Sequence, residues 1–294
     1  MAPASPFDRD AFARGVTELA GLGFDPVFDE RVFDRRGYVA GDAASRAAAL
    51  HDAWRDDRIR AVFVARGGYG SVQLLPLLDA RLARAARKPL VGYSDITSLL
   101  SFLTLSCGVV AFHGPSVAGC LGRGDAAYDR DTLVRALTSP EPLGPLACEE
   151  LAPLKAGRAS GPLLGGTLTQ LVGSLGTRFA FDPPDGFVLL LDEVGERPYR
   201  LDRMLTQLAM AGVLERASGI ISNQLPNCDE PGGRITARET LADVLRNFPG
   251  PVLFGLRTGH TPGQALTIPL GVRVRIDATR DSASFSIVEA AVEP

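Results

Sequence analysis

Apolar and polar residues follow two different patterns along the first half of the chain. Residues 61–65, 89–91 and 109–112 are short apolar runs, which is typical of strands buried on both faces of a sheet. Between these runs apolar residues recur at helical spacing, for example over residues 97–105 and around residues 74–75. Strands that alternate with helices in this way predict a parallel sheet wound with helices.

Capping residues predict where the first helices begin and end. Ser5 followed by Pro6 is typical of an N-cap and a first helical residue, and Asp42 is placed to cap a second helix. Gly21 predicts the end of the first helix. We expect residues 26–28 to form a further short strand.

Residues 141–163 are rich in proline and glycine, and we interpret them as a linker. The linker would separate an N-terminal domain (1–140) from a C-terminal domain (164–294). Apolar periodicity in the C-terminal domain predicts helices at 166–175 and 199–211, buried strands at 187–191, 219–221 and 252–254, and an antiparallel sheet from 266–268, 272–276 and 283–288. The predicted fold is α/β, with an N-terminal wound parallel-sheet domain and a C-terminal mixed α/β domain with antiparallel strands.

Composition and charge narrow the classes of function. Hydrophobic residues make up 46% of the 294 residues, which is enough for a folded core, and the net charge of -3 argues against a nucleic-acid partner. No apolar stretch is long enough to span a membrane, and the first residues lack the pattern of a signal peptide, so we expect a cytoplasmic protein. Four scattered cysteines and three histidines form no zinc-binding pattern.

A glycine-rich segment, 66–70 (Arg-Gly-Gly-Tyr-Gly), directly follows the predicted strand at 61–65. Glycines at such a point let backbone N–H groups face a bound anion or an oxyanion. A dinucleotide-binding fingerprint is incomplete, because position 73 is glutamine where a third glycine or alanine is required. A purely structural loop remains equally compatible with the pattern.

Ser94 lies in a turn between the predicted strand at 89–91 and the helix at 97–105. Turns of this kind expose a serine hydroxyl above the edge of a sheet, beside the N–H groups of the next helix. The usual hydrolase pattern has glycine two residues after the serine, and Ile96 stands there instead. An ordinary N-cap formed by Ser94 or Asp95 explains the turn as well.

Two acids and a histidine in the second half also lie at or just after the ends of predicted strands. Asp192 and Glu193 end the apolar run at 187–191, where open α/β sheets place their sites, although any strand can end in acidic residues. His260 lies in a loop after a predicted strand, where it could act as a general base or simply be solvated. A second histidine, His113, ends a strand and could line a cleft.

The order of these residues, Ser94, then an acid, then His260, suits hydroxyl nucleophilic catalysis. A neutral serine is a poor nucleophile, so a base must take its proton and an acid must orient the base. The glycine-rich segment would supply oxyanion donors. The combination predicts a hydrolase that needs neither a metal nor an organic cofactor.

Several motifs in the same order resemble the LD-carboxypeptidase family, cytosolic serine peptidases of muropeptide recycling. They are residues 65–70, 92–95, 165–168, 192–199 with 202–203, and 259–260. The resemblance implies a serine carboxypeptidase, usually a homodimer, that removes terminal D-Ala from cell-wall tetrapeptides. A sister group, similar to the microcin C immunity peptidases, cleaves peptidyl-nucleotide amides, and a catalytically silent peptide-binding homologue is a third alternative.

The resemblance also assigns roles to single residues. It implies that Ser94 is the nucleophile and His260 the base, with oxyanion donors from the backbone N–H of Asp95 and of Gly67 or Gly68. The family usually has Glu-Asp where this chain has Asp-Glu. The triad acid is therefore Asp192 by position or Glu193 by residue type, and we favour the position.

The terminal carboxylate of a peptide substrate requires a cation. Arg66 and Arg257 are the candidates by their closeness to the motifs, with Tyr69 as a further substrate contact, although structural salt bridges explain such arginines equally well. Family members usually carry a hydrophobic strand before the segment that here begins at Ala2. We therefore expect the first strand to be missing: either the start is misassigned or truncated, or another segment covers the gap. If the strand is lost, we expect lower stability or aggregation.

Overall fold

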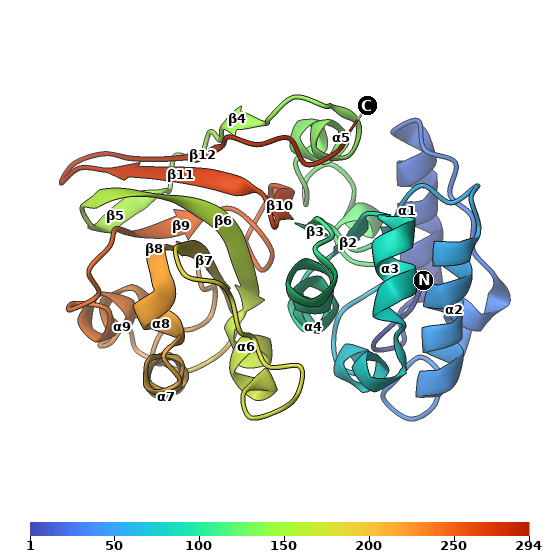
Figure 1. Cartoon of the computed structure of the whole chain (residues 1–294), viewed down its shortest axis with the longest axis horizontal. Helices are drawn as coiled ribbons and strands as arrows, with labels where there is room; N and C mark the ends of the chain where they lie inside the picture. Colours follow the sequence, from blue (N-terminus) through green and yellow to red (C-terminus); the bar gives the residue numbers. More distant parts are fainter. Residues whose placement is uncertain (294) are drawn as a thin grey trace.

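The computed structural model describes residues 1–293, which fold into two sheets surrounded by helices (Figure 1). The smaller sheet has the strand order β1-β2-β3-β10, and the larger sheet has the order β4-β12-β11-β6-β7-β8-β9-β5. The strands are β1 (Val62–Phe63), β2 (Leu90–Gly92), β3 (Ala111–His113), β4 (Gly144–Pro145), β5 (Ala152–Lys155), β6 (Gly157–Thr167), β7 (Phe187–Asp192), β8 (Ala217–Asn223), β9 (Val252–Leu256), β10 (Ile268–Leu270), β11 (Arg273–Ala278) and β12 (Ala283–Ile287). The predicted α/β class is confirmed.

Three strands of the smaller sheet form the wound parallel arrangement that the first half predicts. Strands β1, β2 and β3 pair in parallel. The helices of this half are α1 (Arg9–Gly21), η1 (Glu30–Phe33), α2 (Ala43–Arg55), η2 (Ser71–Leu77), α3 (Ala80–Ala86), η3 (Ser94–Ile96), α4 (Thr97–Ser101), η4 (Phe102–Ser106), η5 (Leu121–Arg123) and α5 (Arg130–Thr138). The helix expected over 97–105 is split into α4 and the π-helical turn η4.

The larger sheet combines parallel and antiparallel strands. Strands β6 to β9 are parallel, while β4, β12 and β11 extend one side and β5 the other by antiparallel pairing. Its helices are α6 (Leu168–Ser174), α7 (Pro198–Met210), α8 (Val213–Arg216) and α9 (Ala237–Val244). Figure 1 shows α7, α8 and α9 on one side of this sheet, with α6 and α4 between the two halves of the molecule.

The segment that we predicted as a linker, 141–163, is not irregular chain. It contains β4, β5 and the first part of β6, which belong to the larger sheet. Pro145 of β4 and Pro153 of β5 are tolerated because these are the two edge strands, where a missing N–H leaves no neighbour unpaired. The boundaries of the two domains stay a prediction.

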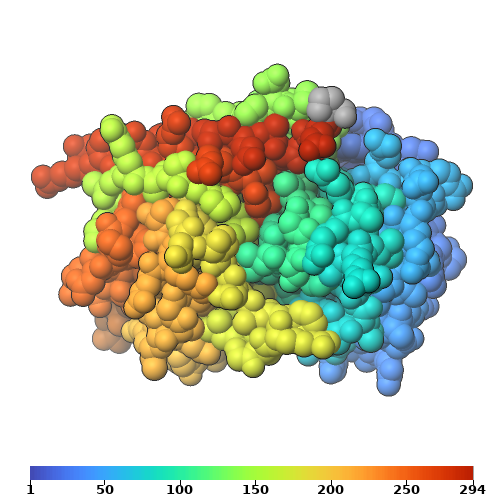
Figure 2. Space-filling view, viewed as in Figure 1, coloured from blue at the N-terminus to red at the C-terminus, as the bar shows by residue number. Residues whose placement is uncertain are grey.

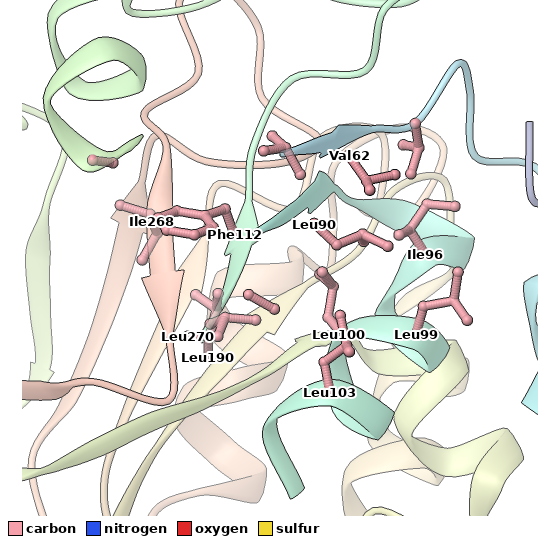
Figure 3. Close-up of a cluster of buried hydrophobic side chains, with 14 of the residues drawn as sticks. Val62, Leu90, Ile96, Leu99, Leu100, Leu103, Phe112, Leu190, Ile268 and Leu270 are labelled. Atoms are coloured by element: carbon pink, nitrogen blue, oxygen red, sulfur yellow. The ribbon is translucent and has the colours of Figure 1, made fainter. Parts of the chain in front are cut away.

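One hydrophobic core joins the two halves. Strand β10, from the second half of the chain, pairs antiparallel with β3, with Ile268 opposite His113. Figure 3 shows Leu190 of β7 beside Leu270 and Phe112, so side chains of both sheets pack together. On the surface, the last residues of the chain, coloured red, run along the upper edge and reach the N-terminal half (Figure 2). A second cluster fills the space between the larger sheet and its helices.

Two local predictions near the N-terminus are wrong. Ser5 does not cap the first helix; Asp8 does, since its carboxylate accepts the Ala11 N–H at 2.8 Å. Residues 26–28 form no strand.

Two backbone hydrogen bonds hold Met1 beside β1. The N-terminal ammonium group of Met1 donates to Phe63 O at 2.9 Å, and the Ala65 N–H donates to Met1 O at 2.7 Å.

Candidate active site

Ser94 stands on a strained turn at the end of β2. Its backbone φ is 67°, a left-handed conformation that costs a residue other than glycine about 1–3 kcal/mol. Gly92 permits the turn, because a Cβ there would lie 2.6 Å from Val64 Cγ2 and 3.0 Å from Ile96 Cγ2. Strained strand-to-helix turns present the nucleophilic hydroxyl of α/β hydrolases, so the local geometry suits Ser94 for attack.

The glycine-rich segment passes directly against Ser94. A Cβ on Gly67 would lie 2.9 Å from Ser94 Cβ and 3.2 Å from Ser94 Oγ. Gly68 and Gly70 adopt φ values of 100° and 130°, which other residues rarely do. The backbone of Gly67 is therefore in contact with the serine side chain, where an oxyanion donor would be needed.

Two residues that the sequence analysis missed hold this segment in place. Ser5 Oγ accepts a hydrogen bond from the Tyr69 N–H at 3.1 Å, which explains why Ser5 is not a helix cap. Arg46 of α2 is only 4% exposed and donates to Gly70 O at 2.9 Å. Neither residue stands out in the sequence, because each is placed by contacts with a distant segment.

The Asp95 side chain fixes the turn to the glycine-rich segment from the other side. Asp95 is 1% exposed, and its Oδ2 accepts the Ser71 N–H at 2.8 Å. Ser71 Oγ in turn donates to Asp95 O at 2.5 Å. Burial raises the pKa of the Asp95 carboxyl, although hydrogen bonds from Ser71 work in the opposite direction. The residue that we expect to donate an oxyanion N–H is thus rigidly held.

Gly67→Ala tests the contact between the segment and the serine. We expect kcat/KM to fall by about 10²-fold, because the new methyl group would displace the Ser94 side chain by a fraction of an ångström. Gly21→Ala is the matched control, since a Cβ at Gly21 meets nothing within 4 Å. Steady-state kinetics of both variants give the two values of kcat/KM. Equal values would show that the position of Ser94 does not depend on glycine at 67.

Asp192 and His260 meet at the carboxyl ends of the parallel strands of the larger sheet. Asp192 ends β7, and His260 follows β9 in a loop. His260 Nδ1 lies 2.8 Å from Asp192 Oδ2, and the His260 backbone N–H donates to Asp192 Oδ1 at 2.9 Å. A Cβ on Gly259 would lie 2.7 Å from Asp192 Oδ1, so glycine is needed for this approach. The carboxylate therefore holds both the ring and the backbone of the histidine.

Two further residues complete the surroundings of Asp192: Thr167, which lies in the motif at 165–168 but was assigned no role, and Asn223, which the sequence analysis missed. Thr167 Oγ1 donates to Asp192 Oδ2 at 2.8 Å. Asn223 Nδ2 donates to Asp192 Oδ1 at 2.6 Å and to His260 O at 2.7 Å. Thr167 ends β6 and Asn223 ends β8, so each comes from a strand that flanks β7. For Asn223, its position at a strand end is the signal that the sequence carries.

The protonation of this pair follows from its contacts. Complete burial works to raise the pKa of Asp192, but the histidines beside it lower that pKa overall, so the carboxylate stays ionised. Burial works to lower the pKa of His260, while its hydrogen bond to Asp192 and the charge of that carboxylate raise the pKa above the usual value. The arrangement suits a histidine that accepts and then returns a proton.

Glu193 makes different contacts from Asp192. Its Oε2 accepts hydrogen bonds from Thr169 N at 2.9 Å and Thr169 Oγ1 at 2.7 Å, and its Oε1 accepts the Val194 N–H at 3.0 Å. Burial raises the pKa of Glu193, although these hydrogen bonds oppose the shift. Glu193 therefore anchors the start of α6, and Asp192 is the acid that contacts His260.

Tyr93 connects the histidine to the serine turn. Its ring lies edge-on to the His260 ring, with 5.0 Å between centroids and 72° between planes, and Ser94 is the next residue. Within residues 1–293 no hydrogen bond joins Ser94 Oγ to His260. Bonds between a nucleophile and its base often form only when substrate is present.

The three predicted substrate contacts differ in their surroundings. The Arg66 guanidinium is exposed and donates only to Pro6 O, at 3.0 Å, among the described residues. The Tyr69 ring is 45% exposed and packs against Tyr38. Arg257 is already engaged, because its Nε lies 3.5 Å from Glu150 Oε2. Of the two arginines, Arg66 is the more available for a carboxylate.

No helix within residues 1–293 combines the length and the apolar character needed to cross a membrane. Over the same residues, no cluster of three or more His, Cys, Asp or Glu side chains is placed to hold a metal ion. All four cysteines are free thiols.

An α/β fold with a half-buried serine turn near a histidine that a buried carboxylate holds is the layout of a hydrolase. The chain belongs to the LD-carboxypeptidase family: the model of the family's N-terminal domain matches residues 1–114, and that of its C-terminal domain matches residues 160–276. It is accordingly a peptidase, as the resemblance implied.

Named relatives cover nearly the whole chain. A protein of Bacillus subtilis named "Probable murein peptide carboxypeptidase" is 34% identical over 301 residues, covering 99% of this chain and 91% of the relative. The murein tetrapeptide carboxypeptidase of Pseudomonas aeruginosa is 33% identical over 267 residues, covering 88% of this chain and 86% of the relative.

Solved structures show the same fold. The muramoyltetrapeptide carboxypeptidase from Oxalobacter formigenes superposes with a TM-score of 0.86 at 27% identity, covering 99% of this chain and 98% of that one. The microcin C7 self-immunity protein in complex with aspartyl sulfamoyl adenosine superposes with a TM-score of 0.88 at 25% identity, covering 100% of this chain and 96% of that one.

Proposed function

We propose that this peptidase is a serine carboxypeptidase that hydrolyses the L,D-amide bond to the terminal D-Ala of cell-wall tetrapeptides. Ser94 is the nucleophile, His260 the general base and Asp192 the acid of the triad. The observation that carries the proposal is the 2.8 Å contact between His260 Nδ1 and Asp192 Oδ2. The His260 ring also packs edge-on against Tyr93, the residue directly before Ser94 in the strained turn.

The reaction follows the usual two steps of acyl transfer. Ser94 Oγ attacks the carbonyl carbon while His260 Nε2 takes the hydroxyl proton, and Asp192 stabilises the imidazolium that forms. The backbone N–H groups of Asp95 and of Gly67 or Gly68 stabilise the oxyanion. His260 returns the proton to the departing amine of D-Ala. Water, activated by His260, then hydrolyses the acyl-enzyme and releases the shortened peptide.

Arg66 is the residue that we propose for the terminal carboxylate of the substrate. It directly precedes Gly67, which contacts Ser94, and its guanidinium makes a single hydrogen bond, to a backbone carbonyl, within residues 1–293. Arg66→Ala should raise KM by about tenfold or more with little change in kcat, because a ground-state ion pair is lost. Arg257→Ala is the control, and a larger KM effect from Arg257 would reverse the assignment.

A second candidate function is hydrolysis of aminoacyl or peptidyl nucleotides. It is favoured by the similarity to the microcin C7 self-immunity protein, whose structure holds aspartyl sulfamoyl adenosine. The same triad would serve it, and only the leaving group would differ. A silent peptide-binding protein is a third candidate, for which the site would keep its shape without turning over substrate.

Parallel assays on two substrates separate these functions. The folded enzyme is incubated with an L,D-tetrapeptide and, separately, with aspartyl sulfamoyl adenosine, and products are quantified by mass spectrometry. We expect kcat/KM on the tetrapeptide to exceed that on the nucleotide by about 10²-fold or more. The reverse preference supports the nucleotide function, and no turnover of either supports a binding protein. The homodimer and the cytoplasmic location stay predictions.

A further inference from the structure

His113 is a buried histidine that the proposed reaction does not use. It ends β3 and is 0% exposed, so it does not line a cleft, which the sequence alone had left open. Its Nδ1 lies 3.0 Å from Thr258 Oγ1, and its Nε2 lies 3.7 Å from Asp192 Oδ2. A Cβ on Gly259 would lie 2.4 Å from His113 Cε1. The ring therefore packs against both the triad acid and the residue that precedes His260.

Hydrogen-bond donors decide which nitrogen of His113 carries a proton. The Thr258 hydroxyl has one hydrogen, and its Oγ1 lies 3.0 Å from Leu266 O, a carbonyl that can only accept. Thr258 therefore donates to Leu266 and accepts from His113. This leaves a proton on His113 Nδ1, since no other arrangement satisfies the buried carbonyl and the hydroxyl together.

His113 Nε2 has no hydrogen-bond partner although it is completely buried. The group it faces is the Asp192 carboxylate, whose two oxygens already accept close hydrogen bonds from Thr167, Asn223 and His260. An unprotonated Nε2 would point its lone pair at this negative charge. A protonated Nε2 would instead place a positive charge beside the carboxylate. A buried charge is favourable only when an opposite charge or hydrogen bonds compensate for it.

We infer that His113 is a positioning residue that carries protons on both ring nitrogens and, as a buried imidazolium beside Asp192, opposes protonation of His260. The inference rests on the proposed function, in which Asp192 and His260 belong to the triad. Asp192 then lies between two imidazole rings, of which the His260 ring must start neutral to accept the proton of Ser94.

The other groups around His113 leave this balance intact. Tyr93 faces it from the turn after β2, with 6.1 Å between ring centroids, and burial raises the pKa of Tyr93, so the phenol is uncharged. The charge of Glu193 adds to that of Asp192 in raising the pKa of His260. A positive charge at His113 offsets this effect and keeps His260 available as a base.

Nitrogen-15 NMR of the histidine rings in the wild-type protein at neutral pH reads the state of His113 directly. The chain has only three histidines, so His51→Gln and His113→Gln variants assign every signal. We expect both ring nitrogens of His113 to give protonated-type signals. One unprotonated-type nitrogen on His113 would overturn the inference. This measurement needs no substrate and no folded variant beyond those used for assignment.

The pH dependence of activity tests the effect on His260. A like charge lowers the pKa of a nearby imidazole, so its removal in His113→Gln should raise the pKa of His260 by about one unit. Activity is lost as His260 becomes protonated, so the acid limb of the kcat/KM profile should move to higher pH by the same amount. His51→Gln is the control, because His51 contacts Asp79 instead.

The same shift can be followed without any turnover. The His260 ring signals are titrated by NMR in the wild type and in His113→Gln, and we expect the midpoint to rise in the variant. An unchanged or lower midpoint contradicts the inference even if the enzyme is fully active. An inactive enzyme with the expected midpoints leaves the inference intact and contradicts the proposed function, so the two failures are distinguishable.

Discussion

A fluorophosphonate probe is expected to label the wild-type chain at Ser94, and His260→Ala is expected to abolish that labelling. The probe reacts only with a serine whose proton is taken by a neighbouring base, and His260 is oriented for this by Asp192 at 2.8 Å. The same substitution should lower kcat by about 10³-fold or more, because the members of a triad act together. Peptide mapping of the labelled protein identifies the modified residue.

Ser98→Ala is the matched control for this experiment. Ser98 lies one turn further along the chain, and its hydroxyl donates to Gln170 Oε1 instead of meeting the triad. Its loss should leave labelling unchanged. Labelling that persists in Ser94→Ala would mean that another residue is the nucleophile.

Asp192→Asn and Glu193→Gln should have very different effects on catalysis. Asparagine at 192 removes the charge that stabilises protonated His260 and can hold the ring in the wrong tautomer, so we expect kcat to fall by about 10⁴-fold. Glutamine at 193 replaces one of the two accepting oxygens with a donor NH2 group, so bonds from either Thr169 or Val194 are lost. We therefore expect stability to fall by about 1–3 kcal/mol and kcat to change less than about tenfold. Kinetics and thermal unfolding of both variants give the two quantities.

The outcome decides between the two acids. If Glu193→Gln abolishes turnover while its melting temperature stays close to that of the wild type, Glu193 acts in catalysis and the assignment by position is wrong. Asp192→Glu is a useful companion variant, because it restores the charge with a longer side chain and reports how much reach the site tolerates.

Much of the fold can be read from the sequence because strands buried on both faces leave a strong local mark. The apolar run at 187–191 becomes β7, and the run at 89–91 becomes β2. The strand that the second half contributes to the smaller sheet has no comparable local signal in the sequence. Pairing of β10 with β3 depends on contacts between residues more than 150 positions apart, and prolines in 141–163 obscure two edge strands.

The candidate site shows the same division. Ser94, Asp192 and His260 are visible because each follows a strand and carries a chemically distinctive side chain. Their supports are not: Arg46 lies on an ordinary amphipathic helix, and Asn223 looks like any strand end. These residues act through hydrogen bonds to distant backbone or side chains, which local patterns do not encode.

The residues of the proposed triad come from both sheets, so the hydrophobic core that joins the sheets must be continuous. Ser94 follows a strand of the smaller sheet, whereas Asp192 and His260 belong to the larger one. Thr97 Oγ1, at the start of α4, accepts the Thr167 N–H at 3.0 Å and so ties the serine turn to the strand beside β7. Displacement of one half against the other would separate the nucleophile from its base.

Mass spectrometry of a cell-wall tetrapeptide tests the central claim most directly. The peptide, ending in D-Ala after an L-centre, is incubated with folded wild-type protein and, side by side, with Ser94→Ala. We predict that the wild type shortens the peptide by one alanine and that Ser94→Ala leaves it intact. An unchanged peptide mass with the wild type, or equal shortening by both proteins, would contradict the account.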